Sequence, residues 1–173
     1  VVLQFGDEIS LEIHSRIRAL SEMLLQYPFP GLIEFVPAYT SLTVYYDPWV
    51  TSQQGELDAY AEAVNKLEIL VEQVQDLQLP LARLVEIPVV YGGEYGPDLE
   101  EVARHNNLST EEVIQLHSSV EYLVHMIGFA PGFPYLGGMD DRIATPRKTS
   151  PRASIPAGSV GIAGSQTGIY PIS

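Results

Sequence analysis

Apolar residues in the first half of the chain recur at helical spacing in two places. One set is spaced by three or four residues and consists of Ile9, Ile13, Ile17, Leu20 and Leu24. A second set follows the same period and consists of Leu57, Ala61, Val64, Leu67, Leu70 (or Val71) and Val74. Each set forms one stripe of an amphipathic helix, and Asp7 or Ser10 can cap the start of the first. Pro28 and Pro30 end the first helix, and Pro80 ends the second.

Four β-rich runs flank these helices: residues 1–5, 32–36, 41–46 and 83–91. Residues 37–40 separate the two middle runs by a short connection that predicts a hairpin, and Asp47-Pro48 ends it. The predicted order is therefore β-α-β-β-α-β. This order is typical of ferredoxin-like folds, in which two helices cover one face of an antiparallel sheet. We expect a ferredoxin-like α+β domain over residues 1–88.

The pattern of predicted elements changes after Gly92-Gly93. Residues 98–106 and 110–118 are predicted as short helices, the second opened by a capping box of Ser109 and Glu112. Residues 120–129 alternate as a strand. One face of that strand would carry Val120, Tyr122, Val124 and Met126, and the other Glu121, Leu123, His125 and Ile127.

The last part of the chain is rich in turn residues. From Gly128 onward it holds eight of the 14 glycines and six of the 13 prolines, with short strands such as residues 159–163 between them. Such a pattern is typical of a small β-barrel or sandwich with large loops. We expect a small β-barrel or sandwich domain over residues 89–173, whose C-terminal part lies outside this sequence because the chain stops within strand-like residues 170–173.

Composition excludes several classes. Hydrophobic residues make up 46% and charged residues 18%, so intrinsic disorder and a collagen-like fibre are excluded. The absence of cysteine excludes disulfide scaffolds, thiolate metal sites and cysteine nucleophiles. No apolar run is long enough to cross a membrane and no signal peptide opens the chain, so we expect a soluble cytoplasmic protein without a membrane partner.

Charge is unevenly distributed along the chain. The formal net charge of −13 argues against a nucleic-acid partner, since phosphates attract basic surfaces. Residues 84–141 carry ten acidic residues and one basic residue, Arg104. Residues 142–173 carry no acid and four bases: Arg142, Arg147, Lys148 and Arg152. This local basic segment could hold an anion, or its four charges could simply be solvated at the surface.

Familiar catalytic motifs are missing. The sequence has no phosphate loop, no dinucleotide-binding glycine motif and no nucleophile elbow. The four histidines are scattered. His14 and His117 fall on predicted helices, where we expect them to face solvent, and His125 is expected to be paired or at the surface. We assign no catalytic residue and no metal site.

The run Gly128-Phe-Ala-Pro-Gly-Phe-Pro-Tyr-Leu-Gly-Gly138 displays three aromatic rings within seven residues on a stiff path. A rigid loop of this kind suits an apolar or planar ligand, because little entropy is lost on binding. The candidate binding residues here are Phe129, Pro131, Gly132, Phe133 and Tyr135. The alternative is a loop that plugs its own barrel with Phe129 and Phe133.

A second run, from Thr145 to Pro171, combines bases with glycines. Arg147 and Arg152 could grip a carboxylate or phosphate in bidentate fashion. Gly158 and Gly164 are expected to leave backbone N–H groups open to an anion. Further candidate anion-binding residues in this run are Ser159 and Gln166.

The chain resembles a known family. The aromatic run, the Pro-Arg pairs at 146–147 and 151–152, and Ile155-Pro-Ala-Gly-Ser-Val-Gly-Ile-Ala-Gly-Ser-Gln-Thr-Gly-Ile-Tyr-Pro171 resemble the B subunit of bacterial ATP-dependent 5-oxoprolinase. That family was formerly labelled allophanate hydrolase subunit 1 and includes the Kip-type inhibitor of a sporulation histidine kinase. Further similar runs are 87–89, 91–93 and 96–99.

The resemblance implies a ferredoxin-like N-terminal domain and a cyclophilin-like β-barrel. It also implies a direct complex with the C subunit of 5-oxoprolinase, to which the A subunit is added for activity. The assembled enzyme would open 5-oxo-L-proline to L-glutamate with hydrolysis of ATP, and no contact of ATP with this subunit is assigned. A regulatory protein that binds a histidine kinase and blocks its autophosphorylation is the alternative function. Prolyl isomerase activity rests only on the analogy of the barrel.

Overall fold

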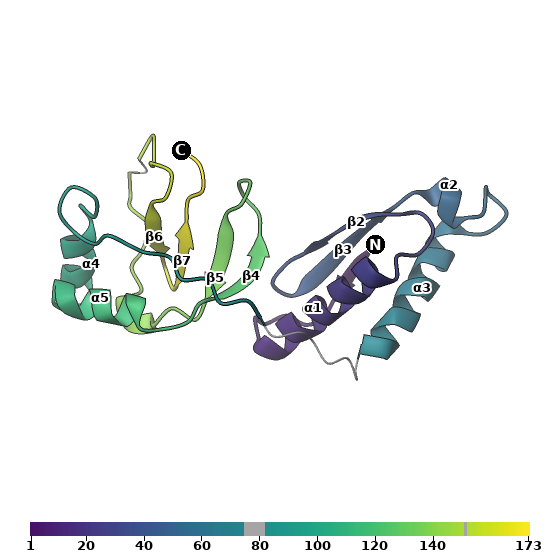
Figure 1. Cartoon of the computed structure of the whole chain (residues 1–173), viewed down its shortest axis with the longest axis horizontal. Helices are drawn as coiled ribbons and strands as arrows, with labels where there is room; N and C mark the ends of the chain where they lie inside the picture. Colours follow the sequence, from purple (N-terminus) through teal and green to yellow (C-terminus); the bar gives the residue numbers. More distant parts are fainter. Residues whose placement is uncertain (75–81, 151) are drawn as a thin grey trace. The chain divides into compact units, whose positions relative to one another are not determined.

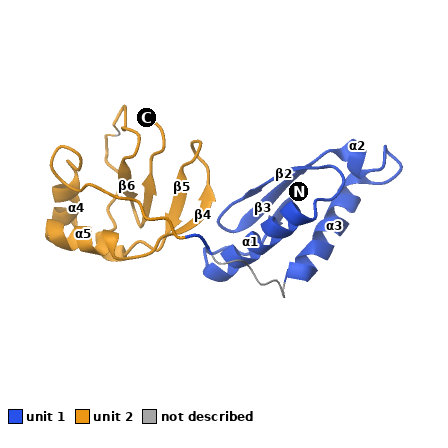
Figure 2. Cartoon of the chain, in the orientation of Figure 1, with its two compact units in different colours: residues 1–83 blue, residues 84–173 orange. Residues whose placement is uncertain are grey.

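The computed structural model describes residues 1–74, 82–150 and 152–173 (Figure 1). The chain divides into two compact units, residues 1–83 and 84–173, which Figure 2 colours separately. Each unit combines helices with an antiparallel sheet, so the α+β class is confirmed. The predicted boundary between residues 88 and 89, and the separate folding of the two parts, stay predictions.

Unit 1 contains one three-stranded sheet and three helices among its described residues. The elements are β1 (Val2–Gln4), α1 (Leu11–Gln26), β2 (Leu32–Pro37), β3 (Ser41–Tyr46), α2 (Pro48–Thr51) and α3 (Ala59–Gln73). The strands are antiparallel in the order β1-β3-β2. Both long helices and the β2–β3 hairpin are therefore confirmed. Helix α2 was not predicted: Asp47 Oδ1 accepts hydrogen bonds from the N–H groups of Trp49 and Val50, so the Asp-Pro pair starts a helix after the strand ends.

The helices of unit 1 begin where their caps stand. Of the two residues predicted to cap α1, Ser10 does so, because its Oγ accepts from the N–H of Ile13 at 3.1 Å. Asp58 caps α3 through the N–H of Ala61 at 2.9 Å. Between helices and sheet lies an apolar core whose most deeply buried members are Leu20, Leu24, Leu42, Val44 and Leu67.

The strand predicted at residues 83–91 is wrong. These residues form no strand, and four apolar side chains among them are 54–70% exposed: Leu84, Val85, Ile87 and Val90. A β-rich run becomes a strand only where a second strand supplies hydrogen bonds, and Pro88 has no N–H to donate. The β-α-β-β-α-β order therefore lacks its final strand among the described residues. The predicted helix end at Pro80 lies outside them.

Unit 2 places two short helices beside a four-stranded sheet. Its elements are α4 (Leu99–His105), α5 (Thr110–Ser118), β4 (Leu123–Ile127), β5 (Pro134–Gly137), η2 (Asp141–Ile143), β6 (Val160–Ala163) and β7 (Gln166–Ile169). The capping box of α5 is confirmed: the Ser109 N–H donates to Glu112 Oε2 at 2.8 Å, and the Glu112 N–H donates to Ser109 Oγ at 3.2 Å. The buried apolar residues are Ala103, Val113, Met139 and Ile143.

The sheet of unit 2 is open. Its antiparallel strands lie in the order β4-β5-β7-β6, and no closed sheet forms within the described residues, so a barrel stays a prediction. The strand predicted at 120–129 begins only at Leu123, and a register shift between Val124 and Met126 breaks its alternation. His125 is therefore buried while Ile127, predicted on the same face, is 62% exposed. None of the helices in the described ranges is long and apolar enough to cross a membrane.

Trypsin should cut the native protein at Arg83 before it cuts at Arg16 or Arg18. Arg83 lies in an exposed segment without strand pairing, whereas the other two arginines lie within α1, whose backbone is protected by helical hydrogen bonds. A digestion series followed by mass spectrometry measures the order of cleavage. Earlier cleavage within α1 would contradict the division into two units.

Candidate functional site

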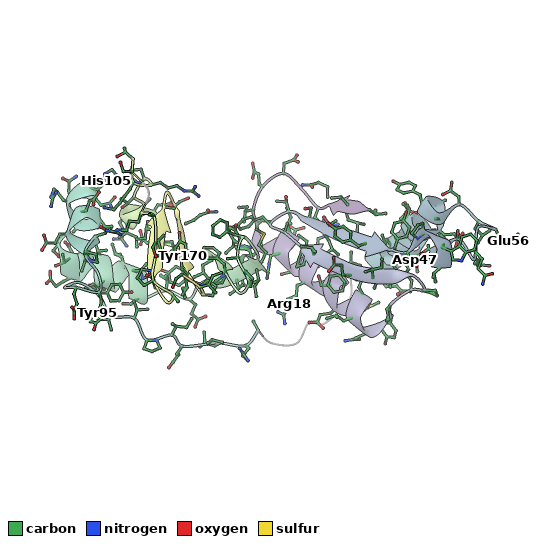
Figure 3. The ribbon with its side chains drawn as sticks, turned by 90° about the horizontal axis from the view of Figure 1, so that it is seen from above. Arg18, Asp47, Glu56, Tyr95, His105 and Tyr170 are labelled. Carbon is green, nitrogen blue, oxygen red and sulfur yellow. The ribbon has the colours of Figure 1, made fainter. Side chains whose placement is uncertain are left out.

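Four aromatic rings gather on the β4–β5 loop and the strands beside it. We call Phe129, Phe133, Tyr135 and Tyr170 the aromatic cluster. The Phe133 ring lies at the centre, with centroid distances of 5.5 Å to Phe129, 5.2 Å to Tyr135 and 5.3 Å to Tyr170, all edge to face. Figure 3 labels Tyr170 near the end of the chain. Such contacts favour a fixed arrangement of the rings.

The two phenylalanines of this cluster differ in burial. Phe133 lies against the backbone of β7, since a Cβ added to Gly168 would lie 2.6 Å from its Cζ atom. Phe129 is 79% exposed and has a left-handed backbone with φ of 65°, which is uncommon outside glycine. Phe133 thus packs as the plug interpretation expects, whereas Phe129 is displayed to solvent.

Backbone hydrogen bonds shape the loop that carries these rings. The Gly128 N–H donates to the Phe133 carbonyl at 3.1 Å, and the Phe133 N–H donates to the Ala130 carbonyl at 3.0 Å. Gly132 has a left-handed φ of 82°. Pro131 is exposed beside it. The structure therefore brings the five candidate residues of the aromatic run together in one folded loop, and their role in binding stays a prediction.

The loop that carries Arg147, Lys148 and Arg152, which we call the basic loop, is held by acids of α4 and its cap. Both terminal guanidinium nitrogens of Arg152 donate to the carboxylate of Asp98, one of them at 2.8 Å. Lys148 Nζ lies 3.0 Å from Asp98 Oδ1 and 2.6 Å from Glu101 Oε2. We call Asp98, Glu101, Lys148 and Arg152 the charged clamp. The hydrogen bond from Arg152 is the main cause that lowers the pKa of Asp98 to about 2.

The charged clamp removes Arg152 from the predicted anion site. The guanidinium of Arg152 is already bound to a carboxylate of the chain itself, so it fixes the loop. Arg147 is exposed and forms no ion pair with any residue that the structure describes. Pro151, which belongs to the second Pro-Arg pair, lies outside the described residues.

The prediction that Gly158 and Gly164 leave their backbone N–H groups open to an anion is wrong. The Gly158 N–H donates to the Tyr170 carbonyl at 2.6 Å, and the Gly164 N–H donates to the Thr145 carbonyl at 2.8 Å. Both groups are used because each glycine lies beside another segment of the chain, Gly158 beside Tyr170 and Gly164 in an antiparallel bridge with Thr145. Ser159 lies in the same ladder, since its carbonyl accepts from the Tyr170 N–H at 2.9 Å. Gln166 lies opposite Ala163 at the start of β7.

Sequence reasoning missed a buried polar network around His117. Thr167 donates its hydroxyl hydrogen to the Gly161 carbonyl at 3.1 Å, so its oxygen accepts from His117 Nε2 at 3.1 Å. Nδ1 is then the acceptor for the Tyr91 hydroxyl at 2.7 Å. The Tyr122 hydroxyl donates to the His117 carbonyl at 2.7 Å. The neutral imidazole of His117 thereby joins α5 to Tyr91 and to β7.

The prediction that His117 faces solvent is wrong, because its side chain is only 7% exposed. The sequence held a signal for this: His117 stands four residues after the buried Val113, on the same face of α5. Burial lowers the pKa of His117 and raises the pKa of Tyr91. Burial also raises the pKa of Tyr122 to about 12. These groups therefore stay uncharged at neutral pH.

The candidate residues of unit 2 differ in exposure. Across residues 1–74, 82–150 and 152–173, no three side chains of histidine, aspartate or glutamate are grouped to hold a metal ion. Phe129 and Arg147 are exposed candidates of unit 2, whereas the imidazole of His117 is buried among its hydroxyl partners. We assign no catalytic residue.

Comparison with known proteins identifies the class. All of residues 1–173 match the family model of the carboxyltransferase domain, subdomain C and D, and the chain belongs to this family. It is 52% identical to the B subunit of 5-oxoprolinase from Bacillus subtilis (strain 168), in a match that covers 100% of this chain and 73% of that protein. The protein of the same name from Escherichia coli O157:H7 is 42% identical, over 99% of this chain and 74% of that protein. The resemblance to the B subunit of 5-oxoprolinase is thus confirmed.

A solved structure has the same fold. The crystal structure of TTHA0988 is 41% identical and superimposes with a TM-score of 0.81, over 99% of this chain and 32% of that one. The chain therefore spans about a third of TTHA0988. The urea amidolyase of Kluyveromyces lactis, at 18% identity and a TM-score of 0.64, shares the fold.

Replacing Asp98 by asparagine should weaken the charged clamp. The pKa of Asp98 is about 2 in the folded chain against an ordinary 3.8, so its ion pairs contribute fully above about pH 4 and are lost as the pH falls toward 2. Because the pairs are partly exposed, Asp98→Asn should lower the free energy of unfolding by about 1 kcal/mol or less at pH 7. The same change should make the free energy of unfolding depend less on pH between about 4 and 2. Urea unfolding at several pH values measures this. Glu100→Gln, an exposed change in the same helical turn, serves as the control and should have no such effect.

Acidification should also destabilise unit 2 through His117. Its pKa in the folded chain lies below the ordinary 6.5, so the neutral network is complete above about pH 6.5 and is lost as the pH falls below it. The midpoint of thermal unfolding of His117→Gln should depend less on pH between 7.5 and 5.5 than that of the wild type. His125, whose pKa burial also lowers, contributes to the slope that remains. An equal slope in His117→Gln and in the exposed control His105→Gln would contradict the assignment.

Proposed function

We propose that this chain is the B subunit of a bacterial ATP-dependent 5-oxoprolinase, which opens 5-oxo-L-proline to L-glutamate while ATP is hydrolysed. The observation that carries the proposal is the 52% identity to a protein of that name over the whole of this chain. Such a protein works within a multi-subunit enzyme. The partners in this proposal are the C subunit, which binds directly, and the A subunit, which is added for activity.

The difficulty of the reaction explains why one chain does not suffice. A five-membered lactam is a poor electrophile in water, and transfer of a phosphoryl group to its oxygen makes the carbonyl carbon open to attack by water. The described residues of this chain do not fit a phosphate cradle, since the Gly158 and Gly164 N–H groups are engaged and no phosphate loop exists. The binding of ATP is therefore proposed for the assembled complex and not for this subunit.

In this proposal unit 2 contributes binding. Arg147, exposed on the basic loop, would contact the carboxylate of 5-oxoproline or the anion formed from it. The charged clamp would keep that loop in place, because Arg152 and Lys148 tie it to the start of α4. Phe129, displayed at the loop tip, would exclude water from the bound ring. The units themselves are proposed as ferredoxin-like and cyclophilin-like.

One observation supports the alternative of a histidine-kinase inhibitor. Docking on a kinase needs an exposed apolar contact and no pocket chemistry, and Phe129 is exposed on a defined backbone. The absence of oxoproline-dependent activity in the assembled complex, together with inhibition of autophosphorylation of a kinase, would favour this function.

The test is reconstitution of the enzyme from purified subunits. The isolated chain should release no ADP with 5-oxoproline, and its mixture with the A and C subunits should do so. In that mixture Arg147→Ala should raise KM for oxoproline roughly ten- to a hundredfold, the expected loss for a hydrogen bond between charged groups. Arg142→Ala is the matched control, since Arg142 is equally basic but paired with Asp140. Wild-type kinetics for Arg147→Ala would end the anion-site proposal while leaving the assignment to 5-oxoprolinase intact.

A further inference from the structure

A second exposed aromatic surface lies in unit 1. It is carried by α2, the turn that follows and the first turn of α3, and we call it the α2 surface. Its apolar members are Trp49 (63% exposed), Val50 (46%), Leu57 (42%) and Tyr60 (62%). Trp49 is the only tryptophan of the chain. Tryptophan and tyrosine are the residues most often found at the energetic centres of protein interfaces.

The turn beneath Trp49 is held in a defined conformation. The Gln54 N–H donates to the Trp49 carbonyl at 2.9 Å, and the Gly55 N–H donates to Ser52 Oγ at 2.9 Å. Gln53 and Gln54 both have left-handed backbones, with φ of 52° and 64°, which is uncommon for residues other than glycine. A Cβ on Gly55 would lie 3.4 Å from the indole ring. The indole is thus displayed on a preorganised turn, which lowers the entropic cost of binding.

The surroundings of the α2 surface are acidic. Residues 19–65 contain six acidic residues and no lysine or arginine. Four of these acids lie in the surface or cap its first helix: Asp47, Glu56, Asp58 and Glu62, of which Glu62 is paired with Lys66 at 3.6 Å. Figure 3 places Asp47 and Glu56 at the same end of unit 1. The carboxylates of Asp47 and Asp58 cap α2 and α3, and Glu56 is exposed. The apolar centre therefore has an acidic rim.

We propose that the α2 surface docks into an apolar pocket, rimmed by lysine and arginine, on another subunit of the enzyme. The inference rests on the proposed function for the identity of that subunit. Charge complementarity selects the partner: a two-fold contact between copies of this chain would place the same carboxylates against each other, and an anionic membrane would repel them. The apolar centre gives affinity and the acidic rim gives orientation and rate of association.

The single tryptophan provides a specific probe. The protein is labelled with 5-fluorotryptophan, and its one ¹⁹F resonance is followed while the unlabelled C subunit, and then the A subunit, is added. We expect a shift or broadening of the resonance on binding of one of them. Trp49→Ala should weaken that binding at least about thirtyfold, as expected for a central aromatic anchor. Tyr60→Ala should weaken it less, and both variants should unfold at the temperature of the wild type because the side chains are exposed.

Charge is tested by reversal. Glu56→Lys should weaken binding about tenfold and reduce its dependence on salt. Glu8→Lys changes the net charge equally and serves as the control. Glu8 follows Phe5, whose N–H donates to the Thr40 carbonyl in the hairpin turn, at the end of the sheet opposite α2. This variant should bind as the wild type does. Leu25→Ala, an exposed apolar change on α1, is the control for Trp49→Ala.

Three outcomes would overturn the inference. An active complex whose ¹⁹F resonance does not move, and which Trp49→Ala forms normally, removes the α2 surface as a docking site and leaves the proposed function standing. A resonance that shifts with the concentration of this chain alone indicates a second copy as the occupant. Subunits that neither assemble nor release ADP with oxoproline remove the proposed function together with the docking inference.

Discussion

The hydrogen bonds of His117 join three segments of unit 2 that are far apart in sequence: Tyr91, α5 and Thr167 of β7. Such polar links matter because the apolar core of this unit is small: among the described residues its cluster has four buried apolar members, against eleven in that of unit 1. A buried imidazole that has both nitrogens bonded avoids the cost of an unsatisfied polar group and fixes one tautomer. The open sheet of unit 2 therefore depends on a neutral histidine as well as on packing.

Charge pairing provides the second constraint, and it decides what the loops of unit 2 can bind. The sequence separates ten acids in residues 84–141 from four bases after them, and folding brings the two sets together at Asp98 and Glu101. Two of the four bases thereby hold a loop in place, and a third, Arg142, pairs with Asp140. Arg147 is left as the basic residue of this segment without an ion pair among the described residues, which is why the proposed anion site is placed at Arg147.

Local patterns predicted the elements whose formation is decided locally. Period and capping residues located α1, α3 and the capping box at Ser109, because these depend on neighbours within one or two turns. The strand at residues 83–91 failed because a strand needs a partner that its own sequence does not encode. The predictions that His117 faces solvent and that the Gly158 N–H is free failed for the same reason. The partners of these groups, Thr167 and Tyr170, lie on distant segments. Non-local pairing is what a single sequence specifies least directly.

Backbone conformation connects the two exposed aromatic surfaces. Among the described residues, four that are not glycine have a positive φ: Gln53, Gln54, Asn107 and Phe129. Two of them form the turn beneath Trp49, and a third is itself the displayed ring of the aromatic cluster. Left-handed backbone at such residues costs energy, and the Trp49 and Phe129 side chains nevertheless stay 63% and 79% exposed. If each unit presents one rigid aromatic side chain to another molecule, both the left-handed backbone and the exposure of Trp49 and Phe129 are explained. One of these contacts would then serve binding and the other assembly.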